Sequence, residues 1–551
     1  MQAMQDTLVV GVDVGTGSAR AALVSASTGL VHKVAVRPTR TWTPRPEYFQ
    51  QSGDDIWAAV CATVQEVTQG IPVDTIKGIG FDATCSLVVL DENHLPVTVS
   101  PQGETEQNII LWMDHRANAE AAFINSTNSE VLKYVGGSIS PEMQTPKLLW
   151  LKKNLPKTWE KAHHFMDLPD FLTWKASGSH SRSLCSLVCK WTYLANEKSK
   201  EGWNAAYFKS IGLEDLLKNN AAKIGQEVLD PGTPVGSGLT ENAAKELGLK
   251  PGTKVATSII DAHAGGVGLM GCNAENISKD FSSKLALICG TSTCHMALSR
   301  EIHFVDGLWG PYWSAMVPNL WLTEGGQTCT GHLVDHIINT HPAFPAAKEK
   351  LAPKEHIQQY LNRILQEMAD KNGVASASFL TKNLHMWPDF HGNRSPLADP
   401  SLLGMLSGLS LAKDEESLAL LYLSTLQALA YGTKQIMNAL YEKGITNIES
   451  VLLCGGLSRN PMFVQVHADV LGLPVLCAKE PESVLLGSAM LAAYAAGVYF
   501  TVGEAMISMG GSADVVTPNK QVVESRFHDK KFKIFLKMVQ HQREYKSIMD
   551  S

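Results

Sequence analysis

The sequence predicts an α/β protein made of two similar domains, and three observations lead to this prediction. The chain has 551 residues, 44% hydrophobic and 18% charged, which suffices for at least two domains with large cores. Strand-like runs and an amphipathic helical pattern alternate near the N-terminus. A Gly-Thr turn between two strand-like runs occurs at Gly15 and again at Gly290.

The first domain is expected to open with a meander of three strands. Residues 8–14, 19–25 and 30–36 are strand-like runs, and short glycine- or serine-containing turns separate them. An amphipathic helix should follow, and residues 76–91 should form a strand, a short turn and a strand. The apolar positions of this helix are Ile56, Val60, Val64 and Val67.

The second domain is expected to begin with a similar strand-turn-strand. Residues 283–290 and 294–299 predict two strands around the turn at Gly290. Pro251-Gly252 precedes the apolar run VATSII, and we divide the chain into an N-terminal domain, 1–258, and a C-terminal domain, 259–551. Residues 341–354 hold three prolines and predict a surface loop, whereas 357–368 and 528–549 predict helices.

Composition and charge limit the kinds of partner. The net charge of −7 argues against nucleic acid as a partner. Residues 484–500 lack charge but are shorter than the roughly 20 apolar residues of a membrane span, so we expect a buried, closely packed helix and no membrane. Ten scattered cysteines without a C-x-x-C pair, and a start that is no secretory signal, favour a cytoplasmic protein. A homo-oligomer remains possible.

The stretch GVDVGTGSAR predicts a phosphate-binding hairpin. It has no lysine for a Walker A loop, and Arg20 stands where a Rossmann fingerprint needs its third glycine. A strand-turn-strand can instead offer backbone N–H groups to a phosphate. Gly15 and Gly17 would allow unusual backbone dihedrals, and Thr16 and Ser18 would add hydroxyl donors. A simple glycine-rich hairpin is the alternative.

Asp13 ends the first strand and would point at the same place. A carboxylate facing phosphates is repelled unless a cation lies between them, so Asp13 predicts Mg²⁺, held through water.

Two further segments extend the predicted nucleotide site. Gly290, Thr291 and Ser292 would form a second phosphate hairpin that faces the first from the other domain. Gly455 and Gly456 end a strand and would let an adenosine ring lie against backbone. Asn460-Pro461 opens a helix whose first N–H groups would be free. An ordinary strand-to-helix turn explains the two glycines equally well.

Together these motifs resemble the FGGY carbohydrate kinases, of the actin-like ATPase superfamily. The order is DVGTGS, SIIDAHAGG, CGTST and GGLSRNP, and the resemblance runs from about Leu8 to Gly497. It implies two ribonuclease-H-like domains with ATP and a sugar in a central cleft.

The resemblance also assigns roles to individual residues. Asp261 would be the catalytic base that activates a sugar hydroxyl; from the residues alone, a helix N-cap is the alternative. Asp82 would orient substrate or metal-bound water, and Ala83 matches the ribulokinase form of the turn after its strand. Lys190 and Glu324 match positions that contact the sugar, although a surface lysine and a loop carboxylate are the simpler interpretations.

These assignments predict a kinase that uses ATP and Mg²⁺ to phosphorylate a ketopentose, D-ribulose at its terminal C5 hydroxyl. Ribitol or another pentulose is the nearest alternative acceptor. A nucleotide-regulated, actin-like binding protein without transfer chemistry is the alternative from another functional class.

Overall fold

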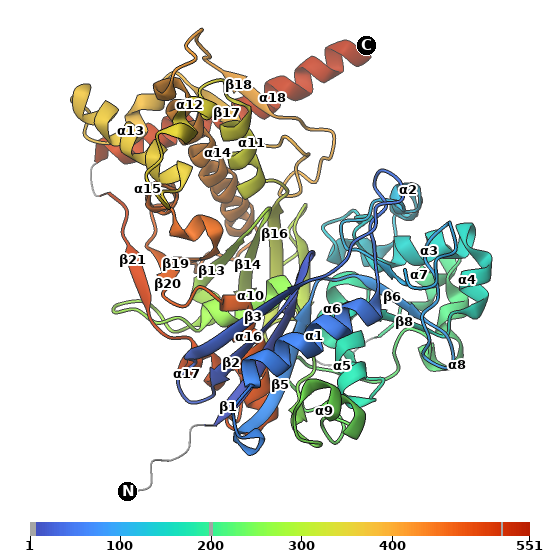
Figure 1. The fold of residues 1–551 in the computed structure, drawn as a ribbon. Helices are drawn as coiled ribbons and strands as arrows, with labels where there is room; N and C mark the ends of the chain where they lie inside the picture. Colours follow the sequence, from blue (N-terminus) through green and yellow to red (C-terminus); the bar gives the residue numbers. More distant parts are fainter. Residues whose placement is uncertain (1–6, 198–201, 520–521) are drawn as a thin grey trace, which may run out of the picture.

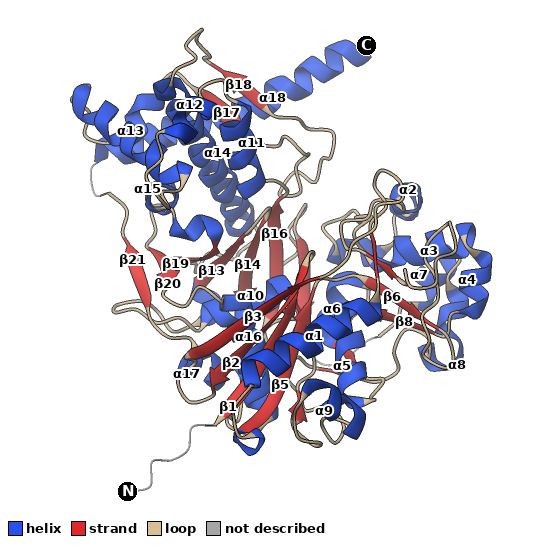
Figure 2. Ribbon diagram, in the orientation of Figure 1, coloured by secondary structure: helices blue, strands red, loops and turns tan. Residues whose placement is uncertain are grey.

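The computed structural model describes residues 7–197, 202–519 and 522–551. Two large sheets lie in the middle of the molecule, each with helices beside it (Figures 1 and 2). A smaller lobe of strands and helices lies beside the first sheet, and a group of helices covers the far end of the second.

The first sheet follows the predicted order. Strands β1, β2 and β3 form an antiparallel meander, and β5 runs parallel to β1. Helix α1 (Gly53–Thr68) packs on β2 and β3 through the predicted apolar stripe, and Ser52 caps its first turn. The strands are β1 (Leu8–Val14), β2 (Ser18–Ser25), β3 (Val31–Pro38), β5 (Ile76–Ala83), β11 (Lys254–Val255) and β12 (Ile259–Ile260).

The second sheet repeats this arrangement. Strands β16, β14 and β13 are antiparallel, and β19 and then β20 continue in parallel, as β5 and β11 do beside β1. The expected pair of similar domains is therefore present. The strands are β13 (Lys284–Cys289), β14 (Thr293–Ser299), β15 (Trp309–Trp313), β16 (Trp321–Gln327), β19 (Ser450–Gly455), β20 (Val475–Ala478) and β21 (Ala513–Val516).

The lobe beside the first sheet is built around a small antiparallel sheet. Its strands are β4 (Gln50–Gln51), β6 (Leu87–Leu90), β7 (Ile109–Ile110) and β8 (His164–Asp167). The associated short pair is β9 (Arg182–Ser183) and β10 (Val228–Leu229). The helices of this region are α2 (Asn118–Ser126), α3 (Gln144–Asn154), α4 (Pro156–Lys161), α5 (Leu168–Ser177), α6 (Leu184–Lys190), α7 (Ala205–Ser210) and α8 (Lys218–Ala221). Helix α9 (Glu241–Leu247) packs on α1 and α5 beside the first sheet.

Helices cover the second sheet, and the long C-terminal helix α18 packs on this group before its end projects from the body (Figure 1). The elements are α11 (Gly331–Thr340), α12 (Phe344–Glu349), α13 (Ile357–Lys371), α14 (Glu415–Glu442), α15 (Pro461–Leu471), α18 (Val522–Asp550) and the hairpin β17 (His385–Trp387) and β18 (Met405–Ser407). Helix α17 (Val502–Met509) lies apart from this group and packs on α16 (Ser483–Ala495).

Two helices join the halves of the chain. Helix α16 (Ser483–Ala495) packs on β1, on β5 and on α10 (Asp261–Met270). Glycines allow this contact, because a Cβ at Gly11, Gly80 or Gly487 would overlap a backbone carbonyl oxygen of the facing element. The expected buried, closely packed helix is thus present up to Ala495, whereas the end of the uncharged run leaves the helix and Phe500 is 92% exposed. In the described part of the chain, no helix combines the length and apolar character that a membrane span requires.

Two expectations need adjustment. The proline-rich segment 341–354 is not all loop, because Pro345 lies in the first turn of the short helix α12. Strand β12 pairs with β5 of the first sheet although it lies beyond the expected boundary at residue 258. The boundary itself stays a prediction.

Candidate active site

Three aspartates meet at one edge of the first sheet. Asp13 and Asp82 are register partners on β1 and β5, and Asp261 follows β12, which pairs with β5 next to Ala83. The three strands are parallel, so their carboxyl ends bring these side chains together. Asp261 is also the first residue of α10, and its Oδ1 accepts a hydrogen bond of 2.7 Å from the adjacent Ala262 N–H.

The charges of this trio influence one another. Burial and the charge of Asp13 raise the pKa of Asp82 well above its usual range. The same two causes raise the pKa of Asp261 to about 6. The buried Oδ1 of Asp82 accepts no hydrogen bond from the described residues, whereas Oδ2 accepts one from the hydroxyl of Ser488. This concentration of acidic oxygens suits a hard divalent cation, which would offset their repulsion.

Arg20 is a further member of the site, to which the sequence pattern assigned no role. Its Nε donates a 2.7 Å hydrogen bond to Oδ2 of Asp13, and its Nη1 lies 2.8 Å from Oε2 of Glu482. Asp13 and Arg20 are cross-strand partners, a relationship that follows from the length of the hairpin turn. The guanidinium thus fixes the orientation of the Asp13 carboxylate.

Both predicted phosphate hairpins are present, with exposed tips. The backbone N–H groups of Thr16 and Gly17, and those of Thr291 and Ser292, donate to no other residue in the described ranges. One expected feature is wrong: neither Gly15 nor Gly17, nor Gly290, has a positive φ. The space beside Gly17 is open, because a Cβ added there would meet no atom within 4 Å.

Each hairpin is held by its own half of the chain. The Trp112 indole donates a 3.0 Å hydrogen bond to Thr16 Oγ1, and Gly331 N donates to Gly290 O at 3.2 Å. Ser18 begins β2 directly after the first turn. That the two hairpins share one polyphosphate stays a prediction.

The two glycines at the end of β19 that were predicted to border the adenosine differ in their need for glycine. Gly455 has a φ of +90°, and a Cβ there would overlap the Cys289 carbonyl oxygen, so glycine is required. Gly456 faces open space.

The expectation of free N–H groups after Asn460 is wrong. Its Oδ1 accepts hydrogen bonds from Met462 and Phe463, and its Nδ2 donates to Gln358 and Tyr422. The side chain of Asn460 therefore caps α15 and leaves these amides occupied.

Lys190 is a buried cation whose ammonium forms neither a hydrogen bond nor a salt bridge with the described residues. It ends α6, is 4% exposed, and its Nζ lies 4.3 Å from the ring centroid of Trp309. The interpretation as a surface lysine is thus wrong, and the three N–H donors remain available to a ligand.

Glu324 lies on strand β16 and not on a loop, and its side chain is buried, with 4% exposed. Burial would raise its pKa, but the positive charges of Lys190 and His263 lower it to about 2. Glu324 is therefore an ionised acceptor beside an unpaired ammonium. Such a combination suits a ligand with several hydroxyl groups.

His263 supports this pair from inside the protein. Its Nε2 lies 3.4 Å from Oε2 of Glu324 and 3.7 Å from Sγ of Cys189. Cys185, one helical turn before Cys189 on α6, completes a buried group around the imidazole. Burial would lower the pKa of His263, but Cys185 and Glu324 raise it to about 10.

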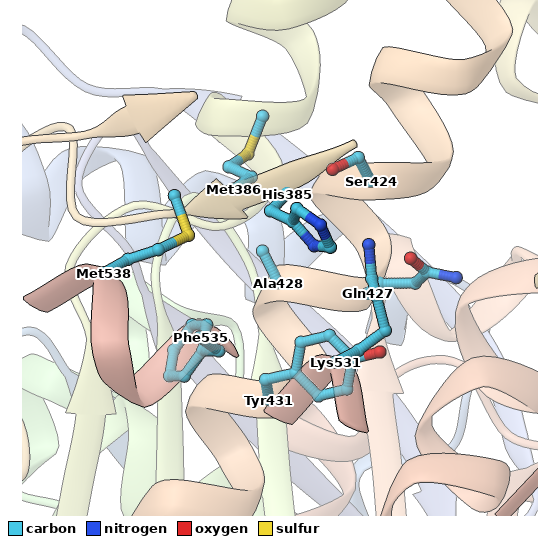
Figure 3. A pocket seen from close by; sticks show the side chains of 9 residues that line it. All are labelled: His385, Met386, Ser424, Gln427, Ala428, Tyr431, Lys531, Phe535 and Met538. Atoms are coloured by element: carbon cyan, nitrogen blue, oxygen red, sulfur yellow. The ribbon is translucent and has the colours of Figure 1, made fainter. Parts of the chain in front are cut away.

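A small cavity elsewhere is not part of this site. It lies between α14, β17 and α18, and its volume of about 10 Å³ has room for one water (Figure 3). Lys531 and Tyr431 line it, and the Lys531 ammonium donates a 2.8 Å hydrogen bond to Thr381 O. None of the predicted site residues borders this cavity.

Comparisons with known proteins agree with this arrangement. Residues 8–268 match the N-terminal domain, and residues 285–496 the C-terminal domain, of the FGGY family of carbohydrate kinases. The chain is 51% identical to a human FGGY carbohydrate kinase domain-containing protein over 98% of both chains. It is 40% identical to a D-ribulokinase of Saccharomyces cerevisiae, over 88% of this chain and 71% of that protein.

A crystal structure of xylulose kinase from Rhodospirillum rubrum shares the fold, with a TM-score of 0.77 and 19% identity over 98% of this chain and 99% of that one. The expected pair of actin-like ATPase domains is confirmed. The chain belongs to the FGGY family of carbohydrate kinases, enzymes that transfer a phosphoryl group from ATP to a sugar.

Proposed function

We propose that this kinase phosphorylates D-ribulose at its C5 hydroxyl, with ATP as donor and Mg²⁺ as the metal. The observation that carries the proposal is the buried, unpaired ammonium of Lys190 beside the ionised Glu324. One group donates and the other accepts hydrogen bonds, as a polyhydroxy substrate requires. The similarity to a yeast D-ribulokinase supports the choice of ketopentose. Ala83, at the end of β5, has only a methyl side chain to place beside the sugar.

Asp261 is the proposed base. It would accept the proton of the C5 hydroxyl as the oxygen attacks the γ-phosphorus of ATP, while the bond from that phosphorus to the β,γ-bridging oxygen breaks and ADP leaves. A pKa of about 6 keeps Asp261 ionised at neutral pH. The free backbone N–H groups of the two hairpins would donate to phosphate oxygens. Gly455 and Gly456 would border the adenosine.

Mg²⁺ fits the concentration of carboxylates at the sheet edge. Asp13 would hold the ion through water, and Arg20 would keep its carboxylate in place. Asp82, whose pKa is raised by burial and by the charge of Asp13, would orient the substrate or the metal-bound water. A bound magnesium ion would neutralise charge on the phosphates during transfer.

The cytoplasmic location and the identity of the acceptor are proposals as well. The ten cysteines are free thiols, which fits a cytoplasmic location. Ribitol and other pentuloses remain the alternative acceptors.

The experiment is a panel of acceptors in a coupled assay of ADP release. D-ribulose, L-ribulose, D-xylulose and ribitol are compared with buffer alone. We expect D-ribulose to give the highest kcat/KM, and NMR of the product to place the phosphate on C5. If another acceptor exceeds D-ribulose, the assignment of the sugar is wrong. If no acceptor raises ADP release above buffer, the assignment to ketopentoses and polyols is wrong.

A further inference from the structure

A group of three histidines lies in the lobe, outside the proposed sugar and phosphate site. His94 follows strand β6, His164 begins β8, and His180 follows α5. One ring nitrogen of each lies within 4.8 Å of those of the other two. The three histidines are separated by at least 16 positions in sequence, and the pairing of β6 with β8 helps bring them together.

The spacing of the nitrogens suits a metal ion. Nε2 of His94 and Nε2 of His180 are 3.2 Å apart. Two nitrogens bound at about 2 Å to one tetrahedral zinc ion are separated by about 3.3 Å. The centroids of the three rings lie 4.5, 4.9 and 5.0 Å apart, and the corresponding ring planes are inclined by 11°, 23° and 33°. The rings are therefore close enough for one ion, but they must turn about their side-chain torsions before all three lone pairs can point at it.

Internal hydrogen bonds do not satisfy the group. A single N–H···N bond between His94 and His180 accounts for one pair of nitrogens. The buried Nδ1 of His164 receives no hydrogen bond from the described residues. Trp174 stacks on His94 with 4.9 Å between the ring centroids, and metal binding would have to alter this contact. A metal ion that accepts electron pairs could replace the single N–H···N bond and occupy the nitrogens that lack a partner.

The rings are in the right chemical form and can be reached. Burial and the neighbouring histidines lower the pKa of His164 to about 4, and burial lowers the pKa of His180. Both are therefore neutral near pH 7, the form that binds metals. His180 is exposed, and the other two are half-buried, so an ion can enter from solvent.

One nearby charge opposes a cation. The Arg182 guanidinium donates a 2.6 Å hydrogen bond to the backbone carbonyl of His180 and contributes to the lowered pKa of His164. The carboxyl of Asp170 interacts with the same guanidinium and offsets part of its charge.

We propose that His94, His164 and His180 form a binding site for a divalent transition-metal ion of the zinc type, with water as the fourth ligand. The ion would link three segments of the lobe. Lone pairs lie in the ring planes, so binding would turn His94 relative to the indole of Trp174.

The test uses the full-length chain after removal of metals with a chelator, in buffer that contains Mg²⁺ to occupy carboxylate sites. Titration with Co²⁺ should produce the visible bands of a four-coordinate ion, and calorimetry with Zn²⁺ should show tight binding. His180→Ala removes one ligand at an exposed position, so its fold should be retained. It should weaken this site for Zn²⁺ at least tenfold and abolish the Co²⁺ bands.

His163→Ala is the matched control, because His163 is the sequence neighbour of His164 and pairs with Glu92 instead. It should bind both metals as the unaltered chain does. Zn²⁺ should also raise the Tm of the unaltered chain and not that of His180→Ala. Equal Zn²⁺ affinity and equal Co²⁺ spectra for the unaltered chain and His180→Ala would overturn the proposal. So would the absence of four-coordinate Co²⁺ bands from the unaltered chain.

Discussion

His263 and Glu324 form a buried ion pair, with Nε2 of the imidazole 3.4 Å from Oε2 of the carboxylate. The two residues come from different elements, α10 and β16, and the carboxylate also faces the charge of Lys190. The pair therefore connects the helix that begins with Asp261 to the group proposed to recognise the sugar. We therefore expect His263 to act through Glu324, as a positioning residue.

His263→Asn should raise the KM for D-ribulose about tenfold with a smaller change in kcat. The pKa of Glu324, now held at about 2 by Lys190 and His263 against the effect of burial, should rise when the imidazole is removed. Protonation of Glu324 would then weaken sugar binding as the pH falls. The measurement is the KM for sugar between pH 5 and 8.

His295→Asn is the control for this variant. His295 is also buried, and it bonds Thr433 at 2.9 Å. Its register partner on β16 is Gly325, so its side chain lies on the opposite sheet face from Glu324. A KM that stays pH-independent in His263→Asn, or that changes equally in both variants, would contradict the positioning role.

Lys190→Met should weaken sugar binding with only a modest loss of stability. Because its ammonium bonds no described residue, methionine leaves no carbonyl without a hydrogen bond, and the loss of its charge only weakens the stabilisation of the Glu324 carboxylate. We expect the KM for D-ribulose to rise at least tenfold while Tm falls less than it does in Lys147→Met.

Lys147→Met is the contrasting variant. The buried ammonium of Lys147 donates to the carbonyls of Leu111 at 2.8 Å and Trp112 at 3.1 Å. Its loss should lower Tm, because both carbonyls lose a hydrogen bond. An equal fall in Tm for both variants would show that Lys190 has a structural role instead.

Gly487→Ala should destabilise the junction of the two halves. The added Cβ would overlap the Ala264 carbonyl oxygen at the contact of α16 with α10. We expect the free energy of unfolding to fall by about 1–3 kcal/mol, a typical cost of overpacking, as measured by urea denaturation. Gly456→Ala places its Cβ in open space and should leave the stability nearly unchanged. Comparable losses in the two variants would show that the predicted overlap at α16 is not the cause.

The activity should have an acidic limb set by Asp261. Its carboxyl must be ionised to accept a proton, and its pKa is raised to about 6. The kcat/KM for the sugar should therefore fall as the pH decreases through about 6, and it should be constant above that range. The measurement is a pH–rate profile at saturating Mg–ATP. A profile that is flat down to pH 4.5 would exclude this carboxyl as the titrating base.

Much of the fold could be predicted because its signals are local. The hairpin around Gly15 and its counterpart around Gly290 are set by alternating apolar residues and short turns. The partnership of His263 with Glu324 depends on how α10 packs beside the second sheet, which no local pattern specifies. The side-chain amide of Asn460 likewise donates hydrogen bonds to Gln358 and Tyr422, from helices far away in sequence.

Asp261 is the proposed base in the phosphoryl transfer to D-ribulose, and the proposed function depends most directly on it. The decisive measurement is kcat for Asp261→Asn with D-ribulose and Mg–ATP at pH 8, with nucleotide affinity measured in parallel. We predict a fall of at least about a hundredfold in kcat with nearly unchanged nucleotide affinity. A kcat close to that of the unaltered enzyme would contradict the account.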